Sequence, residues 1–180
     1  MNTERISIRY ARALLDAAKP NNLENIVFND MILIGDFIKY SRELKNLIKS
    51  PIIKSSHKKS VFNELFSNKI HTLTLNFLNL LADKNREELI PDIINQYKKI
   101  FYKEQGIKEV FITTANDLDD KIKQKIEEKI SKNMNSKIIA KYNIDRSIKG
   151  GIKVQIEDII YDASISTVLK KLYNTLVSAN

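Results

Sequence analysis

Residues 137–161 decide the fold of the second part of the chain and read KIIAKYNIDRSIKGGIKVQIEDIIY. Apolar side chains occupy every second position over residues 137–144 and again over residues 152–156. This period of two predicts two strands, each with one apolar face. The alternating residues are Ile138, Ala140, Tyr142 and Ile144 in the first strand and Ile152, Val154 and Ile156 in the second.

The segment between these strands, residues 145–151, is predicted to form a turn. Gly150 and Gly151 can adopt backbone angles that a Cβ atom forbids. The Asp145 carboxylate can accept a hydrogen bond from the backbone that follows it. We therefore expect these residues to have a structural role.

A third strand and a helix are predicted to follow. Residues 157–158 are few enough to reverse the chain into a strand over residues 159–161. Asp162 and Ser164 then offer side-chain oxygens as N-caps to a helix. The predicted apolar face of this helix consists of Ile165, Val168, Leu169, Leu172 and Leu176.

The sequence before this stretch changes its period near Gly106. Residues 110–114 alternate and predict a strand, whereas residues 117–134 carry an apolar residue at every fourth position and predict a helix. The order strand, helix, three strands, helix predicts a small C-terminal α+β domain over residues 105–180, with mixed strands and two helices.

Helical periods continue through residues 1–104. Five or six short helices with brief connections predict an all-α bundle there. The segment 72–82 is so rich in leucine that we expect it to be covered on most sides, at the centre of the bundle. The predicted segments are 3–19, 23–40, 42–49, a helix capped by Ser55 or Ser56, 72–82 and 87–104.

The first predicted helix carries an alanine-rich stripe. Ala13 and Ala17 lie on the same side of the helix as Tyr10 and Leu14. Such small side chains leave a shallow surface that another helix can approach closely. On periodicity alone, the favoured interpretation of this stripe is the buried face of a core helix.

Charge offers one alternative function. The chain has 30 Lys and Arg against 22 Asp and Glu, a formal net charge of +8, and the excess is spread over both predicted domains. A basic helical nucleic-acid-binding protein is the alternative, although a lysine stripe at helical spacing is usually a solvated face. The stripe in question consists of Lys121, Lys125, Lys129 and Lys132.

Patterns for catalysis, metal binding or membrane insertion are absent from the sequence. The chain has no cysteine, and its two histidines, His57 and His71, lack further ligands at suitable spacing. No apolar run reaches the roughly 20 residues of a membrane span, and the first residues lack the apolar core of a signal peptide. We therefore expect no enzyme, metal or cofactor, and a function located in apolar surfaces that bind other proteins.

Four motifs lie in order along the chain. Residues 10–14 read YARAL, residues 50–52 read SPI with Lys58 following, and residues 76–82 read NFLNLLA with Arg86 following. The fourth motif consists of Asp145, Gly150, Gly151, Asp162, Ala163, Ser164, Leu169 and Leu172. In these motifs the sequence resembles the delta subunit family of bacterial F-type ATP synthase, the counterpart of the mitochondrial oligomycin-sensitivity-conferring protein. Lys149 departs from the family pattern, in which an apolar residue usually precedes the two glycines.

The resemblance implies a non-catalytic stator subunit of the peripheral stalk, which resists rotor torque during proton-driven ATP synthesis at the cytoplasmic face of the bacterial plasma membrane. It implies a six-helix N-terminal bundle that holds the N-terminal helix of an alpha subunit in a groove between its first and fifth helices. On this chain the groove residues would be Tyr10, Ala13, Leu14, Ala17, Phe77, Leu78 and Leu81.

The same resemblance implies that the C-terminal domain grips the far ends of the b subunits. Residues for this docking would be Ile165, Val168, Leu169 and Leu172. The alternative is that these four side chains form the core of the C-terminal domain.

Overall fold

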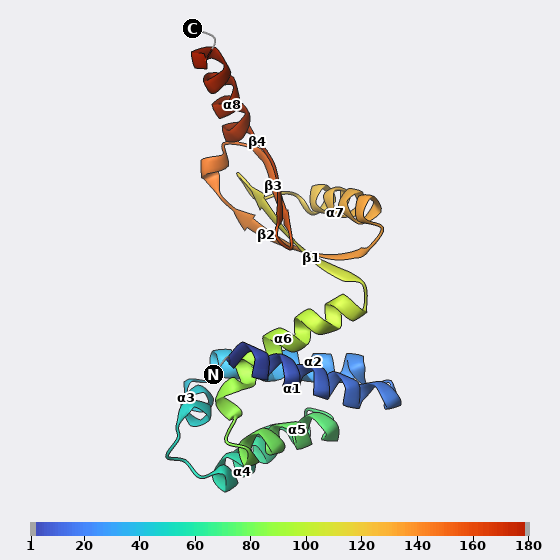
Figure 1. Cartoon of the computed structure of the whole chain (residues 1–180), viewed down its shortest axis with the longest axis vertical. Helices are drawn as coiled ribbons and strands as arrows, with labels where there is room; N and C mark the ends of the chain where they lie inside the picture. Colours follow the sequence, from blue (N-terminus) through green and yellow to red (C-terminus); the bar gives the residue numbers. More distant parts are fainter. Residues whose placement is uncertain (1–2, 179–180) are drawn as a thin grey trace. The chain divides into compact units, whose positions relative to one another are not determined.

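The computed structural model describes residues 3–178. Its backbone divides into two compact units, Met1–Tyr102 and Lys103–Asn180, here called the N-terminal and C-terminal units. Figure 1 shows helices in both units and a sheet in the second. Within the described residues there are eight α-helices and one four-stranded sheet, so the predicted α+β class is confirmed.

Helices α1 to α6 make up the N-terminal unit, with a 3₁₀ turn before α2 and another before α6. Lys54 is the N-cap of α4 and accepts no side-chain hydrogen bond. The prediction that Ser55 or Ser56 caps this helix is wrong, because both serines already lie within it. The helices are α1 Thr3–Ala18, α2 Glu24–Tyr40, α3 Arg42–Lys49, α4 Ser55–Phe66, α5 Thr72–Asp83 and α6 Ile90–Glu104, and the turns are Lys19–Asn21 and Glu87–Leu89.

One hydrophobic core joins these helices. Burying each large apolar side chain contributes roughly 1.5–3 kcal/mol, so this core supplies most of the stability of the unit. Aromatic rings pair inside it, with Phe28 stacked on Phe101 at a centroid distance of 4.4 Å and Phe37 edge-to-face with Phe66 at 5.3 Å. The largest buried apolar side chains are Tyr97, Phe62, Phe66, Leu15, Met31 and Ile34.

The buried carboxylate of Asp30 fixes the start of α5 against α2. Asp30 Oδ2 accepts hydrogen bonds from the backbone amide of His71 at 2.9 Å and from Thr74 Oγ1 at 2.6 Å. His71 is itself the N-cap of α5, since its Nδ1 accepts from the backbone amide of Leu73 at 3.2 Å. These bonds satisfy amides that have no partner inside the helix, and they set where α5 enters the bundle.

A buried ion pair joins α4 to the 3₁₀ turn that precedes α6. The Lys58 ammonium on α4 donates to the Glu87 carboxylate and, at 2.7 Å, to the carbonyl oxygen of Ser50. Both charged side chains are almost completely buried, with exposed fractions of 2% and 6%. This pair ties the Ser50-Pro51 break after α3 to the turn that precedes α6.

The sheet of the C-terminal unit has the order β2-β1-β3-β4. Strand β1 is parallel to β2 and antiparallel to β3, and β3 is antiparallel to β4. The predicted third strand is longer than expected and includes Asp162 and Ser164. The strands are β1 Ile107–Thr114, β2 Lys137–Ile144, β3 Gly151–Ile156 and β4 Ile159–Ser164, and the helices are α7 Asp120–Met134 and α8 Ile165–Ser178.

Strands β2 and β3 are neighbours in sequence but not in the sheet. Parallel pairing of β1 with β2 requires a long crossover, which α7 provides. Because β2 then occupies one edge, β3 pairs on the other side of β1, and residues 145–151 pass across the end of β1. The backbone amide of Asp145 donates to the carbonyl oxygen of Thr114 at 2.8 Å along this path.

Candidate interaction surfaces

Helices α1 and α5 lie side by side in the N-terminal unit. The rings of Tyr10 and Phe77 meet between them edge-to-face, with centroids 6.3 Å apart. Both rings are only partly buried, and Ala13 and Ala17 continue from Tyr10 as exposed residues on α1. The two helices therefore present an apolar strip with small side chains on one wall and large ones on the other.

The structure divides the seven predicted groove residues into two groups. Tyr10, Ala13, Ala17 and Phe77 reach the surface. Leu14, Leu78 and Leu81 are buried in the core, each at most 2% exposed. These three leucines support the strip from below and are not accessible to a partner.

Helix α5 is covered on most sides, as predicted: it contacts α1, α2 and α4, and only one side of it is exposed, at Thr72, Asn76, Leu80 and Asp83. Thr74, Leu78, Leu81 and Ala82 are buried, and Leu73, Leu75 and Phe77 are partly buried against the same core. Leu80 is 46% exposed and lies three residues after Phe77, on the same flank of the helix. Sequence reasoning missed Leu80 as a surface residue, although an excess of leucine beyond one helix face was the available signal. We call Tyr10, Ala13, Ala17, Phe77 and Leu80 the α1–α5 surface.

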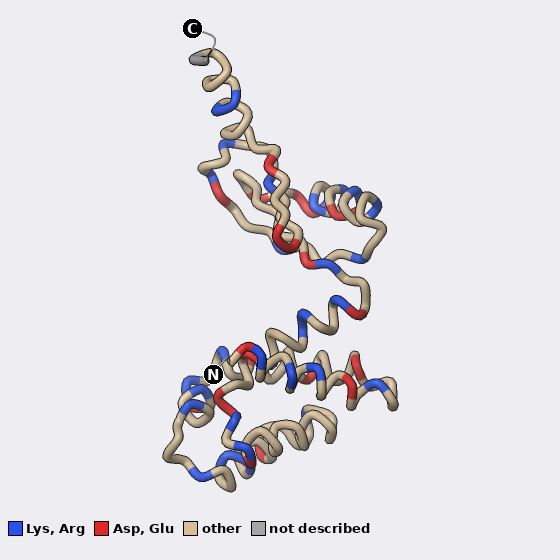
Figure 2. The backbone as a smooth tube through the Cα atoms, in the orientation of Figure 1, with Lys and Arg blue, Asp and Glu red and all other residues tan. Residues whose placement is uncertain are grey.

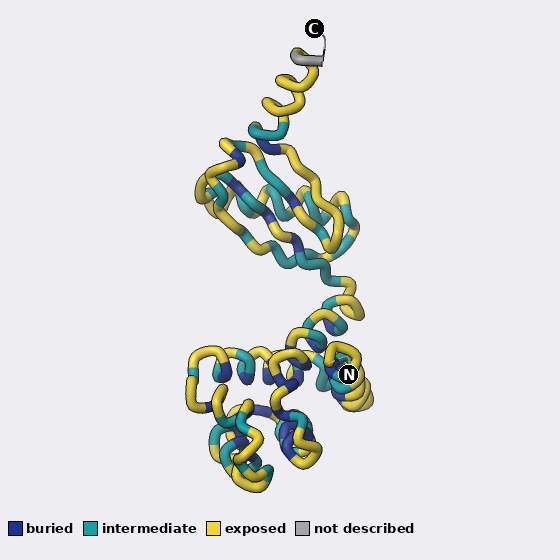
Figure 3. Tube along the Cα trace, turned by 60° about the vertical axis from the view of Figure 1, so that its left-hand side comes forward, coloured by how far each residue is buried: buried dark blue, intermediate teal, exposed yellow. Residues whose placement is uncertain are grey.

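Helix α8 exposes the four residues predicted for docking. Ile165, Val168, Leu169 and Leu172 are between 48% and 56% exposed, so the alternative that they form the domain core is wrong. Figure 3 shows that exposure continues along α8. Tyr173 and Leu176 are exposed too, as are three apolar residues of the edge strand β4, Ile159, Ile160 and Tyr161. Tyr173 and the β4 residues were not predicted as surface residues. We call Ile165, Val168, Leu169, Leu172 and Leu176 the α8 face.

The predicted turn residues anchor the start of α8. The Asp145 carboxylate accepts from the backbone amide of Ser147 at 2.9 Å, as expected, and hydrogen bonds from Ser147 lower the pKa of Asp145. Ile148 is buried, and the carbonyl oxygen of Gly150 accepts from the backbone amide of Ile165 at 3.0 Å. The turn thus holds the first residue of α8 in place.

Asp162 and Ser164 form the N-terminal cap of α8. Asp162 accepts hydrogen bonds from the Ser164 amide and the Thr167 hydroxyl, each at 2.9 Å, and Ser164 Oγ accepts from the Thr167 amide at 3.3 Å. These bonds from Ser164 and Thr167, together with the positive charge of Lys153, hold the pKa of Asp162 well below its usual range. Asp162 is therefore ionised at neutral pH and fixes the direction in which α8 leaves β4.

Gly151→Ala is expected to destabilise the C-terminal unit more than any other glycine-to-alanine change there. Gly151 has φ +74°, and a Cβ atom at this position would lie 2.2 Å from the carbonyl oxygen of Ala163. Gly106 has a similar φ of +63° with no atom within 4 Å, so Gly106→Ala is the matched control. We expect the control to cost about 1–2 kcal/mol for the left-handed backbone alone, and Gly151→Ala to cost more because β3 and β4 must separate. Hydrogen exchange of the β3 and β4 amides measures the difference, and equal protection in the two variants would contradict the contact.

The histidines and one tyrosine are the side chains with the most potential for chemistry. His57 and His71 are exposed, and within residues 3–178 no three His, Cys, Asp or Glu side chains could hold a metal ion. Burial and the hydrogen bond to the Glu127 carboxylate raise the pKa of Tyr142 to about 12, because both favour the neutral phenol. The Tyr142 hydroxyl lies within hydrogen-bonding distance of two acceptors on α7, the Lys123 carbonyl oxygen at 3.2 Å and Glu127 Oε1 at 3.1 Å. This tyrosine ties α7 to β2 and is not a reactive group.

The positive charges are dispersed. The predicted stripe of Lys121, Lys125, Lys129 and Lys132 is exposed on α7, but Figure 2 shows acidic residues interspersed with basic ones in both units. None of the helices in the described part of the chain is long and apolar enough to cross a membrane.

Comparisons with known proteins agree over nearly the whole chain. The family model described as ATP synthase delta (OSCP) subunit matches residues 6–176. The ATP synthase subunit delta of Pelodictyon phaeoclathratiforme is 33% identical over 178 residues, which cover 99% of this chain and 100% of that one. The ATP synthase subunit delta of Rickettsia bellii is 33% identical over 181 residues, covering 100% and 96%. A chain in the cryo-EM structure of the Toxoplasma gondii mitochondrial ATP synthase hexamer has the same fold, with a TM-score of 0.75, 22% identity, and coverage of 95% and 97%.

Proposed function

Because the chain belongs to the ATP synthase delta (OSCP) subunit family, we propose that it links the alpha subunits of the catalytic hexamer to the b subunits of the membrane sector. The family is that of a structural subunit of the peripheral stalk, and the chain is not an enzyme. The observation that carries the proposal is that each compact unit exposes an apolar surface on helices.

The α1–α5 surface is proposed to receive the N-terminal helix of an alpha subunit, as the first and fifth helices of a six-helix bundle. An amphipathic helix binds by laying apolar side chains at helical spacing along such a strip. Ala13 and Ala17 allow a partner backbone to approach α1 closely, while Phe77 and Leu80 offer large side chains for it to pack against. Asp30 fixes α5 through its first turn, which holds the strip in shape before the partner arrives.

Burial of the α1–α5 surface can supply the binding free energy that a stator subunit requires. A subunit that resists torque needs nanomolar affinity or better, which corresponds to about −12 kcal/mol. Burying several large side chains at roughly 1.5–3 kcal/mol each can approach this value. Preorganised helices also reduce the entropy lost on binding, so chemistry within this subunit is unnecessary for its function.

The α8 face is proposed to bind the C-terminal ends of the b subunits. Monomeric soluble proteins rarely expose a continuous apolar face of this kind without a partner. The cap formed by Asp162 and Ser164 and the bond from Ile165 to Gly150 fix the start of α8 on the sheet. Through these contacts, the chain is proposed to be held by its partners at the cytoplasmic face of the bacterial plasma membrane.

Val168→Gln combined with Leu172→Gln is expected to weaken binding of b subunits at least tenfold, since each buried side chain is worth roughly 1.5–3 kcal/mol. Lys171→Gln is the matched control, because Lys171 is exposed and adjacent to Leu172 but points to a different side of α8. Titration calorimetry with a soluble b fragment measures the affinities. Equal effects of the double variant and the control would contradict the proposed docking face.

The assembly experiment tests the function as a whole. The intact chain should co-purify with the alpha-containing hexamer and, through the other unit, with a soluble b fragment, forming a ternary complex. A chain that binds neither partner, or that hydrolyses a nucleotide by itself, would overturn the proposal.

A further inference from the structure

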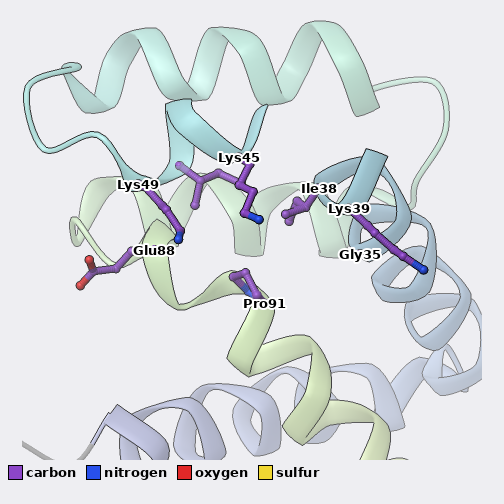
Figure 4. A pocket seen from close by; sticks show the side chains of 8 residues that line it. Gly35, Ile38, Lys39, Lys45, Lys49, Glu88 and Pro91 are labelled. Carbon is purple, nitrogen blue, oxygen red and sulfur yellow. The ribbon is translucent and has the colours of Figure 1, made fainter. Parts of the chain in front are cut away.

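A cavity of the N-terminal unit lies between α2, α3 and the start of α6. Its volume is about 250 Å³, and it shares no residue with the α1–α5 surface. Figure 4 shows its lining, which we call the lysine cavity. The lining residues are Gly35, Ile38, Lys39, Lys45, Ile48, Lys49, Glu88 and Pro91.

The base of the lysine cavity is apolar. Ile38 and Ile48 are buried, with exposed fractions of 7% and 3%, and Figure 4 shows Ile38 and Pro91 directed toward its centre. Gly35 adds no side chain to the wall formed by α2. The cavity therefore has room for an apolar side chain of a partner, but not for a whole helix.

The rim of the lysine cavity carries charges that are not neutralised within the chain. Lys45 and Lys49 are one helical turn apart on α3, and Figure 4 shows both ammonium groups turned toward the cavity. The Glu88 carboxylate points outward, away from them. Across residues 3–178, neither these two lysines nor Glu88 forms an ion pair or a side-chain hydrogen bond.

Two like charges at this spacing on one helix repel each other by a few tenths of a kcal/mol. A carboxylate placed between or beside them relieves the repulsion and gains a charge-assisted hydrogen bond. A bare inorganic anion gains nothing from the apolar base, whereas a segment that carries both carboxylates and an apolar side chain uses both parts of the cavity.

We propose that the lysine cavity docks an acidic segment of another subunit of the same ATP synthase, with two carboxylates one helical turn apart and an apolar side chain between them. The segment places its apolar side chain against Ile38, Ile48 and Pro91 and its carboxylates against Lys45 and Lys49. This contact is additional to the α1–α5 surface and does not depend on which partner that surface binds.

Zero-length carbodiimide coupling in the purified, assembled ATP synthase tests the contact directly, because it joins carboxylates only to amines already within bonding distance. We expect Lys45 or Lys49 to be linked to Asp or Glu of another subunit, in a segment with the stated pattern. Lys59 and Asp83, 2.6 Å apart on the surface, provide the positive control for coupling within the chain. Coupling of Lys59 without any link from Lys45 or Lys49 to another subunit would overturn the proposal.

A charge-reversal pair gives an independent readout. Lys45→Glu with Lys49→Glu should weaken binding of the full chain to the rest of the complex at least tenfold, while helical circular dichroism stays unchanged. Lys121→Glu with Lys125→Glu makes the same change in net charge at the same spacing on exposed α7, and should change affinity less than twofold. Equal losses in both pairs would show a general charge effect and remove the case for a specific site. The same charge-reversal pair can be made in a chain whose α1–α5 surface is already disrupted. If the pair weakens binding further in that chain, the two contacts are separate.

Discussion

Lys58→Met is expected to lower the free energy of unfolding of the N-terminal unit by about 3–5 kcal/mol, the cost typical of breaking a buried ion pair by removing one partner. The variant leaves the Glu87 carboxylate buried at 6% exposure without its counter-charge and leaves the Ser50 carbonyl oxygen without a donor. Glu87 Oε2 already lacks a hydrogen-bond partner, so the remaining charge has little compensation. Urea unfolding followed by helical circular dichroism measures the loss.

Lys59→Met is the matched control for this prediction. Lys59 is the next residue on α4 and pairs with Asp83 at 2.6 Å, but both side chains are substantially exposed, at 33% and 53%. Exposed pairs contribute about 0–1 kcal/mol, so the control should remain close to the parent chain. Lys58→Met combined with Glu87→Leu should be more stable than Lys58→Met alone, since the uncompensated charge is gone. Similar stabilities for Lys58→Met and Lys59→Met would contradict the buried-pair account.

The role of Lys58 could not be predicted from the sequence. The position belonged to a motif that resembles the family, yet the sequence offered no reason for a lysine there, because one apolar face and one polar face account for α4. The reason is tertiary: Lys58 reaches Glu87, 29 residues further along the chain. A periodic pattern describes which side of a helix is buried, but not which polar group crosses to meet another element.

Local elements were largely predictable from the sequence. The bounds of α3 and β2 are those expected, and the Asp145 turn forms the expected bond to the backbone ahead. These features depend on proline, glycine and alternation, which act within a few residues. Strand order was not predictable in the same way. It depends on α7 carrying the chain across the sheet and on β3 pairing with β1, both of which are contacts between distant residues.

The sequence indicated which helices form the α1–α5 surface, but not which of their residues are exposed. An alanine-rich stripe and a leucine-rich helix indicated the α1–α5 surface, yet the seven named residues include three from the core. Helical periodicity places Leu81 and Leu80 only 100° apart, so it cannot decide which of the two faces a neighbouring helix. Packing decides it, and the structure buries Leu81 while exposing Leu80.

Leu80→Asp is expected to weaken binding of an alpha-subunit N-terminal peptide about 100-fold or more, because a charge replaces a large apolar side chain within the proposed contact. Leu14→Asp and Leu81→Asp test the contact poorly, since both residues are buried and a carboxylate there would unfold the bundle. Leu80 is 46% exposed in the free chain, so its variant should keep the parent's thermal stability. Titration calorimetry with the peptide and the intact chain measures the affinity.

Two further variants separate docking from a general loss of apolar surface. Ile32→Asp alters a residue of α2 that is 36% exposed and outside the α1–α5 surface, and it should leave the affinity within about twofold. Ala13→Gln with Ala17→Gln retains good helix formers but fills the shallow wall of α1, so it should block the partner helix by bulk alone. If the glutamine pair binds the peptide as tightly as the parent chain while Leu80→Asp does not, the partner lies over α5 without approaching α1. If neither Leu80→Asp nor the glutamine pair changes the affinity, the alpha subunit binds elsewhere, because a helix lying on this strip cannot avoid both walls.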